Sequence, residues 1–461
     1  MLVTDSLQEQ ALAQVKNHFW QSWRLPFWLL GGKAHLKSQL AKHAPLEVSA
    51  WPVSEEFLEF LRAEHRSGRR LVLATGADEQ IARQVAERFP IFSEIVASDG
   101  TMNCTGATKA GQLVQRFQRG GFDYAGNARV DLPIWEAAQE RILVNGSRSL
   151  QRRLERAGGG VRVFSPRQDL FRVLPRVLRV HQWAKNLLLF VPVVTGHQLM
   201  NPAALWHIGL AFLLFSLCSS SVYVANDLHD LQEDRRHRTK HRRALASGQF
   251  PIVAGLILAP LLAGLGLAGA FFLPPMFLGY LALYCLTSTA YSWFLKRVVL
   301  LDVFVLAGLY TLRILAGHGA TGIPYSSWLL GLSLFLFLSL ALMKRYIELK
   351  RLDSTVNLAA AGRDYQASDL AAVLSLGSAS GYMAVLVLAL YINSEEVRRL
   401  YKQPLVLLFI CPALLYWVSR IWLLATRDRI DDDPVVFALK DKTSYVVGAL
   451  AGVFIWLASG V

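Results

Sequence analysis

The sequence has few cysteines, and their spacing excludes the usual uses of paired thiols. Only four occur in 461 residues, none in a CxxC pair, at Cys104, Cys218, Cys285 and Cys411. A disulfide framework or a cysteine zinc site is therefore not expected, and scattered thiols are typical of a reducing compartment. We also expect no signal peptide, because the stretch from Met1 to Gln10 is polar and contains acidic residues. We expect the N-terminal part to stay in the cytoplasm.

Charged residues are scarce as well, and this excludes an ordinary soluble enzyme. They make up 18% of the chain, against 53% hydrophobic residues, a balance that is too apolar for a typical soluble protein. Residues 1–165 have the composition of a soluble domain, whereas residues 170–461 alternate long apolar runs with short charged connections. We therefore predict a cytoplasmic domain over 1–165 and a membrane domain over 170–461.

The apolar runs predict a mainly α membrane protein with a bundle of nine transmembrane helices. Each run is close to the roughly 20 residues needed to cross a hydrocarbon core of about 30 Å. The nine windows are 183–200, 204–225, 252–272, 275–294, 299–317, 326–343, 370–392, 404–424 and 443–460.

The basic residues indicate the orientation of these spans. The net charge of +14 is compatible with nucleic acid, anionic lipid or a phosphorylated substrate. Lys and Arg cluster in alternate connections, around residues 235–243 and 344–351, which is the positive-inside pattern. We therefore expect a protein of the bacterial inner (plasma) membrane with a cytoplasmic active site and no nucleic-acid partner. The oligomeric state is left open, and a homo-oligomer is compatible with the sequence.

The N-terminal domain has the pattern of an α/β fold. Short apolar runs at 71–74, 122–126 and 141–145 are suited to buried strands, and the first leads through a turn into a polar helical segment at 79–88. Strands that alternate with helices predict an open parallel sheet, a Rossmann-like arrangement.

One acidic stretch lies where the expected span 204–225 meets a run of arginines. After Asn226, carboxylates occur at Asp227, Asp230 and Asp234, a spacing that puts them on one face of a helix. At a membrane boundary they would repel one another unless a divalent cation lay between them. Oxygen ligands suit Mg²⁺, which takes further ligands from substrate phosphates. We predict a Mg²⁺ site for diphosphate chemistry; the alternative is a set of interfacial salt bridges with the arginines.

Other polar residues stand at the cytoplasmic ends of the expected spans, where burial is costly and often functional. Cationic side chains that could bind phosphate and carboxylates that could bind metal are thus expected at the same depth in the membrane. This predicts a polar cavity that opens to the cytoplasm. For the cations the alternative is snorkelling or topology, and for Lys296 and Asp302 it is a pair with each other. The candidates are Arg179, Gln182, Lys185, Asn186, Asn226, His237, Lys240, Arg243, Tyr291, Lys296, Asp302, Arg313, Lys344, Arg345 and Glu348.

The stretch NDLHDLQEDRRHRTKHRRALASG, together with the expected spans, resembles the UbiA superfamily of intramembrane prenyltransferases over about residues 175–461. RVHQWAKNLLLFVPVV, YSWFLKRVVLLDVFVLAGLYTLRILAG and LALMKRYIEL are most similar to decaprenyl-phosphate phosphoribosyltransferases. This resemblance implies Mg²⁺-dependent transfer of 5-phosphoribose from phosphoribosyl diphosphate to a polyprenyl phosphate. It implies metal ligands at Asp227, Asp230 and Asp234, with Lys240 and Arg243 acting on the donor.

One departure favours this branch. Aromatic prenyltransferases of the superfamily carry a second DxxxD-type motif, whereas here Asp302 is followed by Val303-Phe304-Val305-Leu306 with no second acid. The region offers cations instead, which suit additional phosphates; they are Lys296, Arg313, Lys344 and Arg345. Two alternatives remain: an isoprenyl diphosphate donor with an aromatic acceptor, and a transporter or lipid-binding protein.

The N-terminal domain resembles haloacid dehalogenase-type phosphohydrolases. Thr75 after an apolar run, Lys109 and the GNxxxD stretch at 126–131 match motifs of that family. Asn127 replaces an acid of the last motif, and no DxDxT nucleophile motif precedes Thr75. Without the nucleophilic aspartate no covalent phosphoryl intermediate can form, so we predict that this domain, as the sequence stands, has no phosphatase activity. The alternative is that a misassigned start codon leaves out the missing motif.

Overall fold

The computed structural model describes residues 2–44, 46–158, 160–164, 170–237, 239–351, 364–430, 433–438 and 440–459. The chain divides into two compact units. The first comprises Met1–Leu178 and Tyr223–Ala259, and the second comprises Arg179–Val222 and Pro260–Val461. The acidic stretch and the basic residues after it therefore belong to the same compact unit as the N-terminal region.

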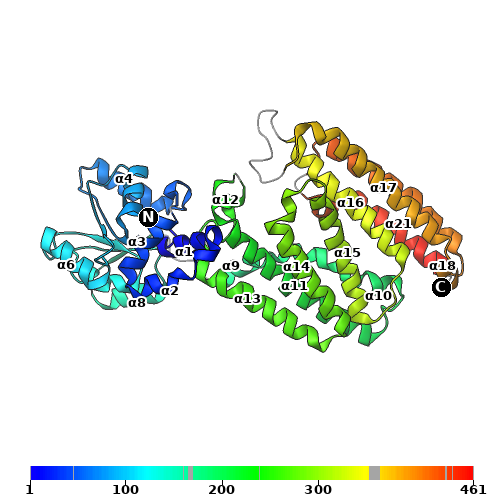
Figure 1. The fold of residues 1–461 in the computed structure, drawn as a ribbon, viewed down its shortest axis with the longest axis horizontal. Helices are drawn as coiled ribbons and strands as arrows, with labels where there is room; N and C mark the ends of the chain where they lie inside the picture. Colours follow the sequence, from blue (N-terminus) through cyan, green and yellow to red (C-terminus); the bar gives the residue numbers. More distant parts are fainter. Residues whose placement is uncertain are drawn as a thin grey trace. The chain divides into compact units, whose positions relative to one another are not determined.

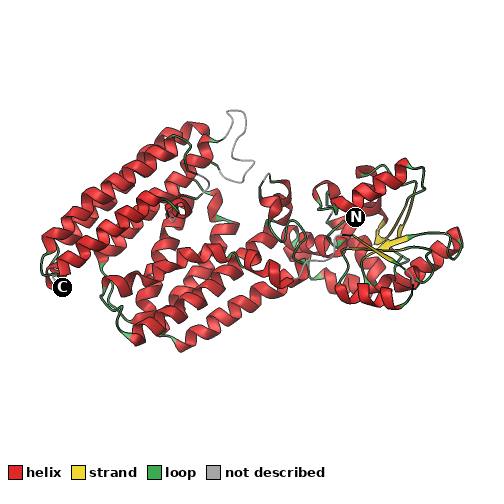
Figure 2. Ribbon diagram, turned by 180° about the vertical axis from the view of Figure 1, so that it is seen from behind, coloured by secondary structure: helices red, strands yellow, loops and turns green. Residues whose placement is uncertain are grey.

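The N-terminal region of the first unit is α/β, and its strands run parallel as predicted (Figure 2). β1 (Val72–Asp78) pairs with β2 (Glu94–Ser98) in one sheet. The second sheet has the order β3 (Tyr124–Gly126), β4 (Arg141–Val144) and β5 (Val161–Phe164). The described strands thus form two parallel sheets instead of the single open sheet expected, because β1 and β3 do not pair with each other.

Amphipathic helices pack on these strands, since each buries one apolar face. Trp135, Leu143 and Leu150 form the centre of the cluster beside β4, and the side chain of Asp78 caps the helix after β1 by accepting from the amide of Gln80. The helices of this region are α1 (Ser6–Asn17), α2 (Arg24–Leu30), α3 (Lys33–His43), α4 (Glu55–Arg66), α5 (Glu79–Arg88), α6 (Gly106–Phe117), α7 (Leu132–Trp135) and α8 (Arg148–Arg156).

The rest of the first unit surrounds the acidic stretch (Figure 1). A buried apolar cluster joins α9 (Leu170–Val177), the end of α11 (Pro202–His229), α12 (Leu231–Arg236) and the start of α13 (Ile252–Gly269). Leu12 of α1 packs against the same cluster. The N-terminal helix is therefore in direct contact with the elements that carry the acidic stretch.

Seven helices in the described part of the chain are long and apolar enough to cross a membrane, which makes the protein a multi-pass membrane protein. They are α11, α13 with η6 (Ala270–Phe272), α15 (Leu301–Thr321), α16 (Ser327–Lys350), η9 (Ala367–Asp369) with α17 (Leu370–Ile392), η10 (Pro404–Phe409) with α19 (Ile410–Thr426), and α21 (Lys442–Ser459). Short helices α18 (Glu395–Leu400) and α20 (Pro434–Ala438) lie between spans.

Two of the nine predicted spans do not meet this criterion. Residues 183–200 form η4 (Val180–Phe190) followed by the short α10 (Val191–Thr195), where Pro192 stands at the junction. α14 (Pro275–Trp293) is helical over 19 residues, but serine, threonine and tyrosine side chains lower its hydropathy. The nine-helix bundle is thus confirmed for seven helices, and these two segments stay predictions.

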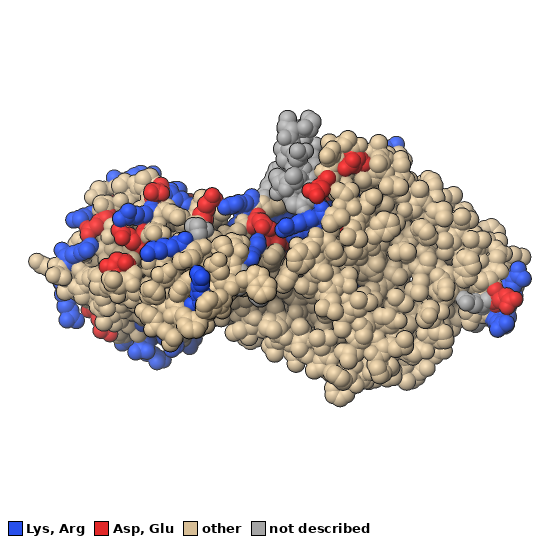
Figure 3. Space-filling view, in the orientation of Figure 1, with Lys and Arg blue, Asp and Glu red and all other residues tan. Residues whose placement is uncertain are grey.

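The helices of the second unit pack through small residues, which allow close backbone approach. Gly377 of α17 faces the ring of Trp422 of α19, and Gly381 faces Val418. Large apolar side chains such as Leu386 and Leu390 point outward and remain exposed. Figure 3 shows a broad surface on this part of the protein where charged residues are few, as expected for a surface that contacts lipid.

Candidate functional site

Two carboxylates of the acidic stretch converge on one arginine. Arg243 Nη1 lies 3.1 Å from Asp227 Oδ1 and 2.5 Å from Asp234 Oδ2. Both aspartates are buried, so two negative charges share one cationic atom away from bulk water. The structure therefore brings together three of the residues that the sequence predicted for metal and donor binding.

Asp230 occupies a different position from the other two aspartates. α11 ends at His229 and α12 begins at Leu231, so Asp230 is the N-cap between two helices. Within the described ranges, no group of three or more Asp, Glu, His or Cys side chains could hold a metal ion. The expected row of three carboxylates on one helix face is not formed, because the helix is interrupted at Asp230, but Asp227 of α11 and Asp234 of α12 still converge on Arg243. The metal role of all three stays a prediction.

The environment of Asp234 favours a nearby cation. Burial raises the pKa of Asp234 above its ordinary value, and the negative charge of Asp227 acts in the same direction. Arg243 and Lys240 oppose this rise. A buried carboxylate of this kind stays ionised only while positive charge is close. The donor set consists of oxygen atoms with a need for positive charge, and this fits Mg²⁺.

The remaining candidates of the first unit are in the same stretch of chain. Asn226 precedes Asp227 and is partly buried, His237 follows α12 in an exposed position, and Lys240 begins η5 (Lys240–Arg242). The Lys240 amide donates to His237 Nδ1 at 3.4 Å. The loop therefore places exposed cationic and polar groups directly after the two converging carboxylates.

Two lysines of the second unit act on an aspartate that the sequence analysis did not single out. Lys185 Nζ donates to Asp433 Oδ2 at 2.7 Å. Although burial opposes ionisation of Asp433, Lys185 and Lys344 lower its pKa below the ordinary value. Lys185 Nζ also lies 5.9 Å from the centre of the Tyr310 ring. The available signal was the acidic run 431–433 in a connection that is otherwise rich in Arg and Lys.

Arg313 is buried among neutral groups. Its guanidinium donates to Asn186 Oδ1 at 3.0 Å and to the hydroxyl of Tyr284 at 3.2 Å. Its Cζ lies 5.4 Å from the centre of the Tyr310 ring, the same ring that Lys185 approaches. In the part of the chain that the structure describes, Arg313 makes no ion pair. Lys185 and Arg313 therefore bring two cationic groups to one aromatic ring.

The segment η4 positions four of the candidates. Arg179 is its N-cap with φ of 51°, and the amide of Gln182 donates to the carbonyl oxygen of Arg179 at 2.7 Å. Asn186 is buried and donates to Ser216 Oγ at 3.0 Å. The segment thus directs Asn186 into the interior and keeps Gln182 and Lys185 partly buried.

Asp302 and Arg345 form a buried ion pair. Arg345 Nε lies 2.7 Å from Asp302 Oδ2, and the side chains are 1% and 0% exposed. The hydroxyl of Tyr365 donates to Asp302 Oδ1 at 2.7 Å, and Arg345 also pairs with Glu348. The structure thus engages Asp302 with Arg345, whereas the sequence had left open a pair between Asp302 and Lys296.

Tyr291 and Lys296 flank the end of α14. Tyr291 lies in the last turn of the helix, and Lys296 follows in η7 (Leu295–Arg297). Both side chains are partly buried. Their substrate-binding role stays a prediction.

A cavity of about 1,530 Å³ lies within the first unit and is lined by both β1 and β3. Thr75, Lys109, Asn127 and Asp131 line it as well, and these are the residues that resemble haloacid dehalogenase motifs. Lys109 Nζ lies 3.1 Å from Asp131 Oδ1 and donates to the hydroxyl of Tyr124 at 2.7 Å. The structure gathers these residues in one cavity, and the family identity of the domain stays a prediction.

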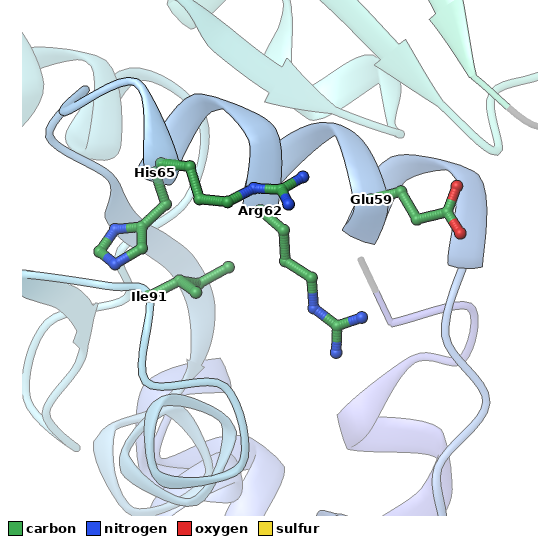
Figure 4. Close-up of a pocket in the computed structure, with 5 residues that line it drawn as sticks. Glu59, Arg62, His65 and Ile91 are labelled. Carbon is green, nitrogen blue, oxygen red and sulfur yellow. The ribbon is translucent and has the colours of Figure 1, made fainter.

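A second hollow, of about 500 Å³, lies beside α4 and is shown in Figure 4. Glu59, Arg62, His65 and Arg66 line it together with Ile91. Its four charged or titratable side chains are exposed, and water competes strongly for exposed polar groups. It therefore has none of the buried polar groups that orient a ligand.

Comparisons with known proteins match the membrane part through a family model and most of the chain through one relative. Residues 189–440 match the model described as the UbiA prenyltransferase family. The uncharacterized protein y4nM of Sinorhizobium fredii is 38% identical over 429 residues, which cover 92% of this chain and 83% of that protein. The nodulation protein NoeC of Azorhizobium caulinodans is 36% identical over 58% of this chain and 87% of its own length. Decaprenyl-phosphate phosphoribosyltransferase of Mycobacterium tuberculosis is 34% identical over 42% of this chain and 65% of that enzyme.

Proposed function

Because the chain belongs to the UbiA prenyltransferase family, we propose that it transfers 5-phosphoribose from phosphoribosyl diphosphate to a polyprenyl phosphate. As a member of that family it is a multi-pass membrane transferase. The relatives named decaprenyl-phosphate phosphoribosyltransferase support the choice of substrates. We assign it to the bacterial inner membrane with the active site facing the cytoplasm, where connections rich in Lys and Arg remain.

The observation that carries this choice is the buried pair of Asp302 with Arg345. A prenyltransferase that binds an isoprenyl diphosphate through two acidic motifs needs free carboxylates at the second position. Here that position holds one carboxylate, which an arginine already neutralises, and Tyr365 occupies its other oxygen atom. This chemistry favours phosphate recognition by cations over a second metal site.

The donor diphosphate would bind beside the two converging carboxylates. Asp227 and Asp234 would hold Mg²⁺, with Asp230 as a third predicted ligand, and the ion would supply positive charge to the leaving diphosphate. Arg243 already lies between the carboxylates, so it can turn toward phosphate oxygens once a metal balances their charge. Lys240, in the exposed loop, provides a second cation for the diphosphate.

The acceptor phosphate would bind to cations of the second unit. Lys185 and Arg313 approach the Tyr310 ring, and Arg313 makes only neutral contacts within the described residues. A phosphate would give this buried guanidinium an anionic partner. Lys344 shares Asp433 with Lys185 and extends the positive region.

The reaction we propose is a displacement at the anomeric carbon of the ribose. A phosphate oxygen of the lipid forms the new bond to this carbon, and the bond to the diphosphate oxygen breaks with its electron pair leaving on the diphosphate. The nucleophile is already an anion, so no strong base is required. Positioning and exclusion of water therefore account for most of the rate, because hydrolysis is the competing reaction.

Reconstitution with labelled donor tests this proposal. Purified full-length protein in nanodiscs receives MgCl₂, radiolabelled phosphoribosyl diphosphate and a polyprenyl phosphate, and lipid extraction follows. We expect label in the organic phase and release of one diphosphate for each labelled lipid. Samples without polyprenyl phosphate serve as the control.

The alternative substrates give a different result. Absence of labelled lipid, together with transfer from an isoprenyl diphosphate to an aromatic acceptor, would overturn the proposal in favour of aromatic prenyl transfer. Absence of both reactions, with lipid scrambling or ion flux instead, would favour a transporter.

A further inference from the structure

Glu9, a buried glutamate of α1, binds two side chains of α12, the helix that carries Asp234. Arg235 Nη2 lies 2.5 Å from Glu9 Oε1, and Gln232 Nε2 donates to Glu9 Oε2 at 3.0 Å. The Arg235 and Glu9 side chains are 1% and 0% exposed. Both carboxylate oxygen atoms of Glu9 thus accept hydrogen bonds from side chains of α12. These side chains, Gln232 and Arg235, flank Asp234 in the sequence.

The same arginine also holds the loop that returns from α12. Arg235 Nε donates to the carbonyl oxygen of Ala246 at 3.1 Å. Ala246 follows Arg243 by three residues in the sequence, and Arg243 is the residue that joins Asp227 to Asp234. One buried ion pair therefore fixes α12 and the basic loop together.

Packing adds to these polar contacts. Leu12 lies one helical turn after Glu9 and contacts the cluster that includes Leu228 and Leu231. A buried ion pair whose partner is removed leaves an uncompensated charge in an apolar environment. Displacement of α1 from α12 therefore carries a large penalty, and α12 is held firmly where it is.

We propose that Glu9 is a positioning residue for the transferase, and that the N-terminal region acts as a clamp that fixes α12 for binding of metal and diphosphate. Glu9 touches none of the proposed reacting groups. It acts through Arg235, which holds α12 and with it Asp234. Groups that orient a metal ligand without touching the metal change the affinity for the metal in the same way. The metal site at Asp234 and the choice of substrates in the assay rest on the proposed function, whereas the contact of Glu9 with α12 does not.

A matched pair of variants tests the clamp. Glu9→Ala removes the buried partner of Arg235, whereas Glu47→Gln removes the partner of the neighbouring Arg236 in a pair that is 72% and 58% exposed. In the full-length protein we expect Glu9→Ala to raise the half-saturating Mg²⁺ concentration about tenfold or more, with a smaller change in kcat. Glu47→Gln should stay within about twofold of the wild type.

Hydrogen exchange provides a readout that does not depend on turnover. We expect amides of residues 231–236 to exchange faster in Glu9→Ala than in the wild type, and Mn²⁺ binding followed by electron paramagnetic resonance to weaken. Wild-type exchange and wild-type Mn²⁺ affinity in folded Glu9→Ala protein would overturn the clamp. If the wild type fails to use phosphoribosyl diphosphate, the proposed function fails, and these two measurements still decide the clamp.

Three further variants keep the test possible if Glu9→Ala does not fold. Glu9→Gln keeps the shape and the contact with Gln232 but removes the charge. Glu9→Arg combined with Arg235→Glu restores an ion pair with reversed polarity. We expect the double variant to recover Mg²⁺ affinity relative to Glu9→Arg alone, and equal affinity in both would contradict a role for the pair.

Discussion

Arg243 explains how two acids persist at a membrane boundary. Its single Nη1 atom contacts both Asp227 and Asp234, so the pair is balanced before any substrate arrives. This resembles the interfacial salt bridge that was the alternative for the acidic stretch. The ion pair and a metal site are compatible, because Arg243 is 29% exposed and can turn away from an incoming divalent cation, whereas Arg345, which pairs with Asp302, is 1% exposed.

Conservative removal of either charge tests the metal role. We expect Asp227→Asn or Asp234→Asn to lower kcat about a hundredfold or more, since each amide loses the charge that attracts Mg²⁺. Asp428→Asn is the matched control, because Asp428 is exposed, pairs with Lys350 and has a φ of 56°, which asparagine tolerates. Full activity of both motif variants would remove the metal assignment.

Asp433 gives a pH-dependent prediction. Its pKa is lowered in the folded protein, so its charge contributes stability above the ordinary aspartate pKa, and this is lost as the pH falls through the folded value. We expect Asp433→Asn to lower stability at neutral pH by about 3 kcal/mol, and the difference from wild type to shrink below about pH 4. Thermal unfolding across pH measures this, with the exposed Glu395→Gln as control.

The spacing of residues in the sequence predicted part of the candidate site. The rest of the site depends on contacts between residues far apart in the sequence. The spacing of Asp227 and Asp234 predicted that they lie close together, and they do converge on Arg243, although they belong to two helices and not to one helix face. Asp433 pairs with a lysine 248 residues away, and no local pattern encodes that distance. The pair of Asp302 with Arg345 was missed for the same reason, although both residues were candidates.

Helices of the second unit depend on close contacts at glycines. A Cβ at Gly377 would lie 2.3 Å from the Trp422 ring, which is fixed by a hydrogen bond from its Nε1 to Ser339. The ring cannot move away cheaply. The contact therefore sets the distance between α17 and α19.

Alanine substitution tests this contact. We expect Gly377→Ala to lower stability by about 1 to 3 kcal/mol through overpacking, measured by thermal unfolding in detergent. Gly448→Ala on α21 has no atom within 4 Å of the added carbon, so it should be neutral or stabilise by about 0.5 to 1 kcal/mol. Equal effects would show that α17 adjusts freely.

Sequence periodicity predicted most elements of the fold. The strands predicted at 71–74, 122–126 and 141–145 correspond to β1, β3 and β4. Short apolar runs between helical segments are typical of buried strands. The division into two sheets was not predictable, since strand pairing is non-local. Residues 183–200 contain Lys185 and Asn186, whose contacts favour an irregular segment over a straight span.

Removal of metal ions from the whole protein tests the proposed transferase activity. The proposed mechanism uses a divalent cation, so we expect excess EDTA to abolish formation of labelled lipid and MgCl₂ to restore it. A rate unchanged by chelation, with metal content checked by mass spectrometry, would contradict the metal dependence.

The N-terminal region should lack phosphatase activity. Lys109 is neutralised by Asp131 within the cavity, and the chain has no DxDxT nucleophile before Thr75. We expect no release of inorganic phosphate from p-nitrophenyl phosphate with MgCl₂ present, beyond the rate of a Lys109→Ala variant. Turnover that disappears in Lys109→Ala would reveal an alternative nucleophile.

The pair of Lys185 with Asp433 also constrains the order of biosynthesis. Lys185 is translated early, yet its partner emerges only after the spans α11 to α19 have been synthesised. A nascent chain that ends before residue 433 contains Lys185 but not this aspartate. The pair therefore forms only in the last stage of synthesis, and a product truncated before residue 433 cannot form it.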